Sequence, residues 1–94
     1  MGKVAKTIDN KLRSEFAPSR LAVEDESSRH HGHAGWREGG ETHFRVEIVS
    51  AAFEGQSRVA RQRLVYAALK DEFAAGLHAL ALTTLTPGED GAKR

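Results

Sequence analysis

The stretch THFRVEIVS, residues 42–50, decides the fold that this sequence predicts. Apolar and polar side chains alternate strictly along it, which is typical of a strand with one buried face. The apolar positions are Phe44, Val46 and Ile48, and the polar positions between them are His43, Arg45 and Glu47. We therefore expect the apolar side chains to face a core and His43 to lie on the outer surface of a sheet.

Two further strands are predicted, one before this stretch and one after it. The stretch RLAVEDESS, residues 20–28, alternates briefly and predicts a short strand. The stretch LHALALTTL, residues 77–85, is apolar on both faces, which favours a central or well-covered strand. A loop rich in histidine and glycine separates the first two strands.

Residues 4–16 predict the first of two amphipathic helices. Ile8, Leu12 and Phe16 recur every four residues and form one apolar stripe between lysine, aspartate, asparagine and arginine side chains. Pro18 ends this helix, because proline disfavours helical geometry in the residue that precedes it.

Residues 58–73 predict the second helix, with Ser57 as its N-cap and Gly76 at its C-terminal end. Its expected buried stripe consists of Leu64, Val65, Ala68, Leu69 and Phe73. The element order is then helix, strand, strand, helix, strand. This order predicts an α+β fold with two layers, in which a three-stranded sheet carries the helices on one face.

The length and composition limit what the chain can be. Its 94 residues suffice for a single domain over residues 1–94. Within it we expect residues 4–86 to be ordered and the polar residues 87–94 to form a disordered tail. The net charge of +1 argues against a strong, sequence-independent grip on nucleic acid. No apolar run approaches the roughly 20 residues of a membrane span, and the N-terminal segment lacks a secretory core, so we expect a cytoplasmic protein.

Four of the five histidines lie in RHHGHAGWREGGETHF, residues 29–44, and the chain has no cysteine. Those before the strand are His30, His31 and His33. Such a loop is either a metal site or a solvated polar turn, and the spacing alone leaves both open. His78 directly follows a leucine in the stretch GLHAL and opens an apolar strand, so it is either a half-buried structural residue or a placed ligand.

The second helix carries three arginines near its start. Arg58 and Arg61 are three residues apart and share a face, whereas Arg63 lies elsewhere around the helix. They form either a solvated surface or a basic helix that enters a DNA groove. The preceding turn lacks the second glycine of a G-x-x-G loop, which disfavours RNA binding in the manner of a KH domain. No motif of an enzyme active site is apparent.

Three stretches together resemble the BolA family: GGETHFRVEIVS, FEGQSRVARQRLVYAAL and GLHALALTTLTPGE. The resemblance covers nearly all of residues 4–89 and implies a fold similar to a class II KH domain. It also implies an adaptor that pairs with a monothiol glutaredoxin around a shared 2Fe–2S cluster, in iron homeostasis or cluster trafficking. Members of the family are also described as DNA-binding transcriptional regulators, which is the alternative function for the basic helix and its Arg58, Arg61 and Arg63.

The resemblance also implies which residues hold the cluster. His78 matches the C-terminal ligand of the family and His30 matches the loop ligand, with His33 and His31 as weaker candidates. Ser28 stands where relatives often carry another histidine, and Gln62 stands where they often carry histidine in the second helix. Since the chain has no thiolate, the sulfur ligands are expected from the glutaredoxin and its glutathione. The isolated chain is expected to bind no cluster and to be a monomer or a weak homodimer.

Overall fold

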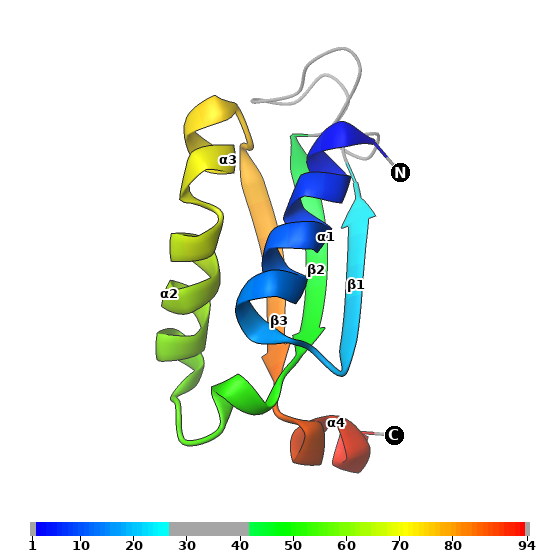
Figure 1. Ribbon diagram of the computed structural model, residues 1–94, viewed down its shortest axis with the longest axis vertical. Helices are drawn as coiled ribbons and strands as arrows, with labels where there is room; N and C mark the ends of the chain where they lie inside the picture. The colour runs from blue at the N-terminus through cyan, green and yellow to red at the C-terminus, as the bar shows by residue number, and fades with distance from the viewer. Residues whose placement is uncertain (1, 27–41, 94) are drawn as a thin grey trace.

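The computed structural model describes residues 2–26 and 42–93 of the chain. Their elements follow in the order α1 (Lys3–Phe16), β1 (Arg20–Asp25), β2 (His43–Val49), the short 3₁₀ helix η2 (Ala51–Phe53), α2 (Arg58–Ala68), α3 (Lys70–Ala75), β3 (Ala79–Leu85) and α4 (Pro87–Lys93). Helices α1 and α2 cover one side of a three-stranded sheet, as Figure 1 shows. The predicted α+β fold with two layers is confirmed.

The sheet has the strand order β1-β2-β3. Strand β1 pairs with β2 antiparallel, with Val23 opposite Val46. Strand β2 pairs with β3 parallel, with His43 opposite Ala79. A parallel pair needs a crossover connection, which the segment containing α2 and α3 supplies. The N-terminal ends of β2 and β3 therefore lie side by side at one end of the sheet.

Strand β3 occupies an edge of the sheet, so the predicted central or well-covered position is wrong. Leu80 and Leu82 pack against the core on one face. The side chains of the other face are exposed: Ala79, Ala81 and Thr83. Alanine counted as apolar in the sequence pattern, but its single methyl group leaves little surface that needs to be covered.

Helix α2 shields the edge strand through two long hydrogen bonds. The hydroxyl of Tyr66 donates to the carbonyl of Leu80 at 3.5 Å. Nη1 of Arg61 donates to the carbonyl of Thr84 at 3.4 Å. Unpaired backbone groups on an edge strand invite pairing with another chain, and side chains that occupy them reduce that hazard.

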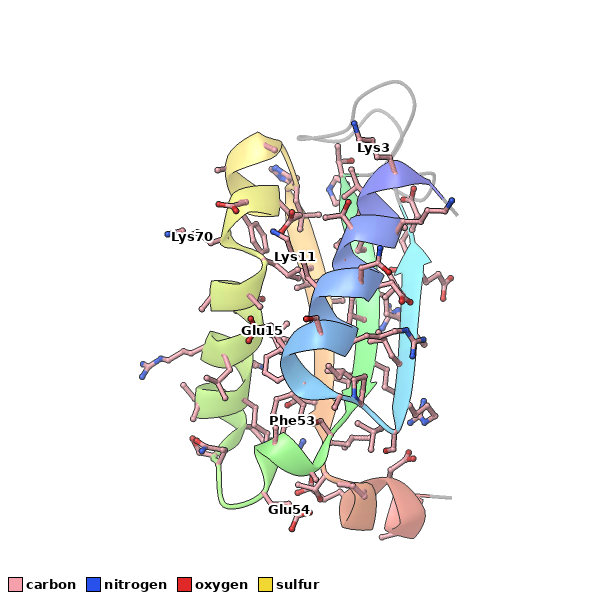
Figure 2. The ribbon with its side chains drawn as sticks, viewed as in Figure 1. Lys3, Lys11, Glu15, Phe53, Glu54 and Lys70 are labelled. Atoms are coloured by element: carbon pink, nitrogen blue, oxygen red, sulfur yellow. The ribbon has the colours of Figure 1, made fainter. Side chains whose placement is uncertain are left out.

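The core lies between the helices and the inner face of the sheet. The apolar stripe of α1 contributes Ile8 and Leu12, and both side chains are fully buried. They pack in one cluster with the apolar side chains of β2, namely Phe44, Val46 and Ile48. The inward alternation predicted for β2 is therefore confirmed. Away from the core, Nζ of Lys11 lies 2.9 Å from Oε2 of Glu72 and ties α1 to α3 (Figure 2).

The predicted second helix is divided at Leu69 into α2 and α3. Val65 and Leu69 are fully buried as expected, whereas Leu64 is 42% exposed and does not belong to the buried stripe. Ser57 accepts a hydrogen bond from the N–H of Ala60 at 3.1 Å, which confirms the N-cap. Gly76 follows α3 with φ +128°, a conformation that favours glycine, which confirms the predicted end.

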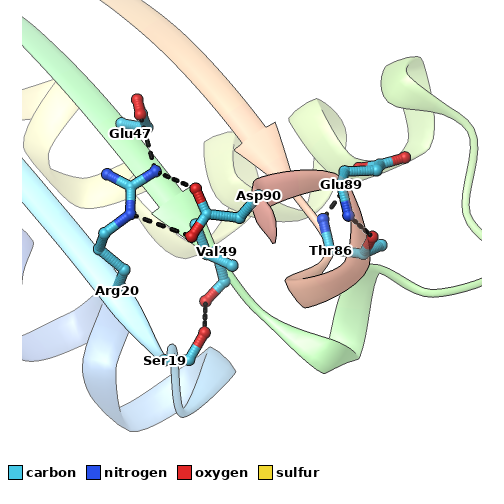
Figure 3. Close-up of polar contacts among 7 residues, drawn as sticks. All are labelled: Ser19, Arg20, Glu47, Val49, Thr86, Glu89 and Asp90. Carbon is cyan, nitrogen blue, oxygen red and sulfur yellow. Dashed lines mark hydrogen bonds and ion pairs between the residues drawn. The ribbon is translucent and has the colours of Figure 1, made fainter. Parts of the chain in front are cut away.

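The C-terminal residues fold as helix α4 instead of the predicted disordered tail. Thr86 and Glu89 form a capping box: the N–H of Thr86 donates to the Glu89 carboxylate at 2.9 Å, and the N–H of Glu89 donates to the Thr86 hydroxyl at 3.2 Å. Pro87 at the first helical position is favoured there as well. Figure 3 shows this box and a second tie, in which Arg20 bonds to Asp90 at 2.6 Å. The stretch TPGE thus contained the signal for this helix.

Candidate functional site

His43 and His78 meet at the end of the sheet where β2 and β3 begin. His43 is the first residue of β2, and His78 directly precedes β3. The centroids of their rings lie 5.1 Å apart, with the ring planes tilted by 53°. The two histidines are distant in sequence, and the parallel register of β2 and β3 brings them together.

The backbone of His78 is fixed from both sides. The carbonyl of Thr42 accepts hydrogen bonds from the N–H of His78 at 2.8 Å and from that of Ala79 at 3.1 Å. The preceding residue, Leu77, is buried, and its N–H donates to the carbonyl of Glu72 at 3.0 Å. The exposed side chain of His78 therefore projects from a main chain that the fold holds in place.

His43 differs from His78 because its side chain is buried, with an exposed fraction of 5%. Its Nδ1 lies 2.9 Å from the hydroxyl Oγ1 of Thr42, within hydrogen-bond distance. The predicted outer-surface position of His43 is therefore wrong. The alternation of β2 correctly places its ring away from the Phe44 face, but alternation does not determine what covers the other face at the end of a strand.

The loop histidines His30, His31 and His33 lie outside the described residues. Their roles as ligands therefore stay predictions. Within residues 2–26 and 42–93, no group of three or more histidine, aspartate or glutamate side chains is placed to hold a metal ion. His78 is exposed and firmly placed, so its imidazole can serve as one ligand of a site whose remaining ligands come from elsewhere.

The three arginines of the predicted basic helix lie in different environments. Arg58 and Arg63 are exposed. Arg61 is buried, with an exposed fraction of 6%, and its Nε donates to the carbonyl of Gln56 at 2.9 Å. Its Nη1 donates to Oε1 of Glu89 at 2.7 Å. The guanidinium of Arg61 is thus engaged inside the protein, so of these three arginines Arg58 and Arg63 are the exposed ones.

The position of Arg61 could have been found in the sequence. Arg61, Val65 and Leu69 are spaced four residues apart and share one face of the helix. Because Val65 and Leu69 were expected in the core, Arg61 stood at the end of the same buried stripe. Its positive charge is compatible with this buried position because Glu89 pairs with it.

Comparison with known proteins identifies the family of this chain. The family model described as BolA-like protein matches residues 12–89. The chain belongs to the BolA family. The BolA domain of SufE1 from Arabidopsis thaliana, a solved structure, is 47% identical to this BolA-like chain with a TM-score of 0.86, and the match covers 95% of this chain and 98% of that one.

Two curated Arabidopsis thaliana relatives are longer than this BolA-like chain. SufE-like protein 1, chloroplastic/mitochondrial, is 47% identical over 93 residues, which are 95% of this chain and 25% of the relative. Protein BOLA1, chloroplastic, is 47% identical over 91 residues, which are 95% of this chain and 57% of the relative. The chain thus spans about a quarter of the first relative and little more than half of the second.

The same relatives bear on the location of the protein. Both are described as chloroplastic, and one also as mitochondrial, so the cytoplasmic location stays a prediction. Across the part of the chain that the structure describes, no helix has the length and apolar character needed to cross a membrane.

Proposed function

We propose that this BolA-like protein is an adaptor that pairs with a monothiol glutaredoxin and shares a 2Fe–2S cluster with it, in iron homeostasis or cluster trafficking. The observation that carries the proposal is His78, an exposed imidazole on a main chain anchored by the carbonyl of Thr42. Membership of the BolA family supports an adaptor or regulatory role over an enzymatic one.

The chemistry of the chain fits half of a cluster site. Histidine can replace cysteine as a ligand of iron in a 2Fe–2S cluster. His78 would supply one ligand, and a loop histidine, His30 in preference to His33 or His31, would supply the second. The chain has no cysteine, so the two sulfur ligands would come from the glutaredoxin cysteine and from glutathione bound to the partner. The isolated chain, a monomer or weak homodimer, would bind no cluster.

Protonation limits this function, because only a neutral imidazole can ligate a metal. Protons and the cluster compete for the ring nitrogen of any histidine ligand. Formation of the shared cluster should therefore weaken in acidic solution.

The test mixes the apo-protein with a cluster-loaded glutaredoxin homodimer. Visible circular dichroism reports the change of ligands, and size-exclusion chromatography reports the heterodimer. We expect a new circular dichroism spectrum whose change is complete near one equivalent of this protein per glutaredoxin. The cluster should elute in one peak with both proteins. Thr83→Ala is a matched control and should give the same heterodimer as the wild type, since Thr83 is an exposed side chain of β3, the strand that His78 directly precedes. An unchanged spectrum together with the absence of a heterodimer peak would contradict the proposed adaptor function.

DNA binding is the second candidate, because two exposed arginines remain on α2. Arg58 and Arg63 are available to phosphate groups. The near-neutral net charge makes this function the weaker of the two, since phosphate contacts rest on a basic surface. The two functions are compatible, since cluster binding in the heterodimer can change the affinity of the protein for DNA.

A further inference from the structure

We propose that His43 is a positioning residue for His78: its enclosed ring, held by the hydroxyl of Thr42, sets the orientation of the exposed imidazole of His78. The inference rests on the proposed function, because it concerns the presentation of the ligand that this function needs. It adds a residue whose proposed role is to orient the ligand and not to bind the metal itself.

The first observation is that the ring of His43 is enclosed and lies within hydrogen-bond distance of Thr42. Its ring is 5% exposed, and Nδ1 lies 2.9 Å from the hydroxyl of Thr42. Among the described residues, every buried side-chain nitrogen or oxygen has a hydrogen-bond partner. The ring of His43 therefore cannot turn toward a metal without losing its hydrogen bonding and its burial. We infer that it stays in one orientation beside His78.

The second observation is that the ring of His43 contacts the side chain of His78. The ring centroids are 5.1 Å apart and the planes are tilted by 53°, within the range of attractive tilted ring pairs. The main chain of His78 is anchored by the carbonyl of Thr42, but that anchor leaves the side-chain torsions free. The contact with His43 restricts those torsions.

Thr42 and His43 thus restrict different parts of His78, its main chain and its side chain. The carbonyl of Thr42 fixes the main chain, and the ring of His43 limits the side chain. A ligand that is ordered before binding loses less conformational entropy when the metal arrives. Ordering one side chain with several rotamers corresponds to a change in affinity of about 2- to 12-fold. Loss of the ring of His43 should therefore shorten the lifetime of the shared cluster by about that factor.

The first experiment uses the isolated protein and needs no cluster. In NMR spectra of the wild type, the carbon-bound ring protons of His43 and His78 should show a nuclear Overhauser contact. Relaxation of the His78 ring carbons should show an ordered side chain. His43→Ala should raise the mobility of that ring, and His43→Phe, which retains an aromatic ring, should restore its order. An equally ordered His78 ring in folded His43→Ala protein would overturn the proposal.

A second variant protects the test against misfolding, because removal of a buried ring can destabilise a domain. Thr42→Val removes the hydroxyl that holds His43 and keeps both the side-chain shape and the carbonyl that anchors His78. It should loosen the ring of His78 to a lesser degree than His43→Ala. Unchanged order of His78 in this variant, with the His43 ring demonstrably mobile, would also contradict the proposal.

The second experiment uses the heterodimer with the glutaredoxin. The rate of cluster loss and the electron paramagnetic resonance spectrum of the reduced cluster are compared for the wild type, His43→Ala and His43→Phe. We expect faster loss and a broadened spectrum for His43→Ala, with recovery in His43→Phe. Identical lifetimes and spectra would overturn the positioning role. If the wild type forms no such heterodimer, the proposed function fails, and the ring measurements in the isolated protein still decide the role of His43.

Discussion

Nη1 of Arg61 lies 2.7 Å from Oε1 of Glu89, and Nη2 of the same guanidinium lies 3.2 Å from Oε2. The contact is bidentate, which makes it one of the stronger kinds of ion pair. It joins α2 to α4 at the end of the sheet opposite His78 (Figure 1). Arg61 is buried, so this carboxylate balances its positive charge inside the protein, and the carbonyls of Gln56 and Thr84 accept further hydrogen bonds from it.

Glu89→Gln should destabilise the protein, because a neutral amide cannot balance the buried guanidinium of Arg61. We expect a lower midpoint of thermal unfolding and faster hydrogen exchange of the amides in α4. Glu54→Gln is the matched control, since Glu54 is an exposed glutamate beyond η2. Equal midpoints for the two variants would show that the ion pair contributes nothing to stability.

The same carboxylate predicts a pH dependence of stability. The hydrogen bonds from Arg61 and then from the N–H of Thr86 lower the pKa of Glu89 from 4.5 to about 2. Because the pKa is lower in the folded state, the contribution of Glu89 is complete above about pH 4.5 and is lost as the pH falls toward 2. Urea unfolding between pH 7 and pH 2 should show a smaller loss of stability in that window for Glu89→Gln than for the wild type. Parallel curves of stability against pH for the two proteins would show that Glu89 does not cause this pH dependence.

Two leucines of the predicted helix stripe should respond differently to truncation. Leu69 is fully buried and Leu64 is 42% exposed. Leu69→Ala should lower the free energy of unfolding by about 2–5 kcal/mol, because it leaves a cavity in the core. Leu64→Ala should change it by less than about 0.5 kcal/mol. Chemical denaturation of both variants measures these losses. Equal losses would contradict the orientation of the segment from Leu64 to Leu69 against the core.

The histidine ligands should not be equivalent in cluster sharing. His78→Ala should abolish the heterodimer spectrum, because no other described imidazole is exposed at this end of the sheet. His30→Ala should only weaken or slow formation, since His31 and His33 can substitute for it, and the variant that lacks all three should lose the spectrum. Cluster-transfer titrations, with far-UV circular dichroism as the check on folding, compare these variants. A wild-type spectrum from folded His78→Ala protein would show that His78 is structural.

DNA binding, if it uses α2, should depend on the exposed arginines. Each phosphate contact that Arg58→Ala or Arg63→Ala removes should reduce the slope of log K against log salt by about 0.9. Arg61→Ala should leave the slope unchanged wherever the protein stays folded, because its guanidinium is buried against Glu89. Fluorescence anisotropy with duplex DNA across a salt series measures the slopes. Wild-type slopes for Arg58→Ala and Arg63→Ala would remove α2 from the DNA interface.

Periodicity was enough to predict what β2 and α1 contribute to the core. The alternation of Phe44, Val46 and Ile48 and the helical spacing of Ile8 and Leu12 follow from which side chains must leave water. Sequence patterns failed where small or charged residues took positions by context. The alanines of β3 lie exposed on an edge strand, and Arg61 occupies a buried stripe because Glu89 compensates its charge.

The histidine pair could not be derived from the sequence in the same way. His43 and His78 are neighbours only because β2 and β3 are parallel and in a particular register. Local patterns specify which segments are strands, but the choice of partner and direction depends on the packing of α2 and α3 across the sheet. The burial of His43 likewise depends on what covers a strand end, which alternation does not specify.

The parallel pairing of β2 and β3 has a consequence for the order in which the protein is made. Thr42 and His43 leave the ribosome well before His78, and β3 can dock only after the two helices between them have been synthesised. A nascent chain that stops before residue 78 lacks His78, so it has neither the anchor on the carbonyl of Thr42 nor the contact between the rings. The oriented imidazole therefore exists only after β3 has been made and has docked on β2, so that a shorter chain cannot present this ligand to a cluster.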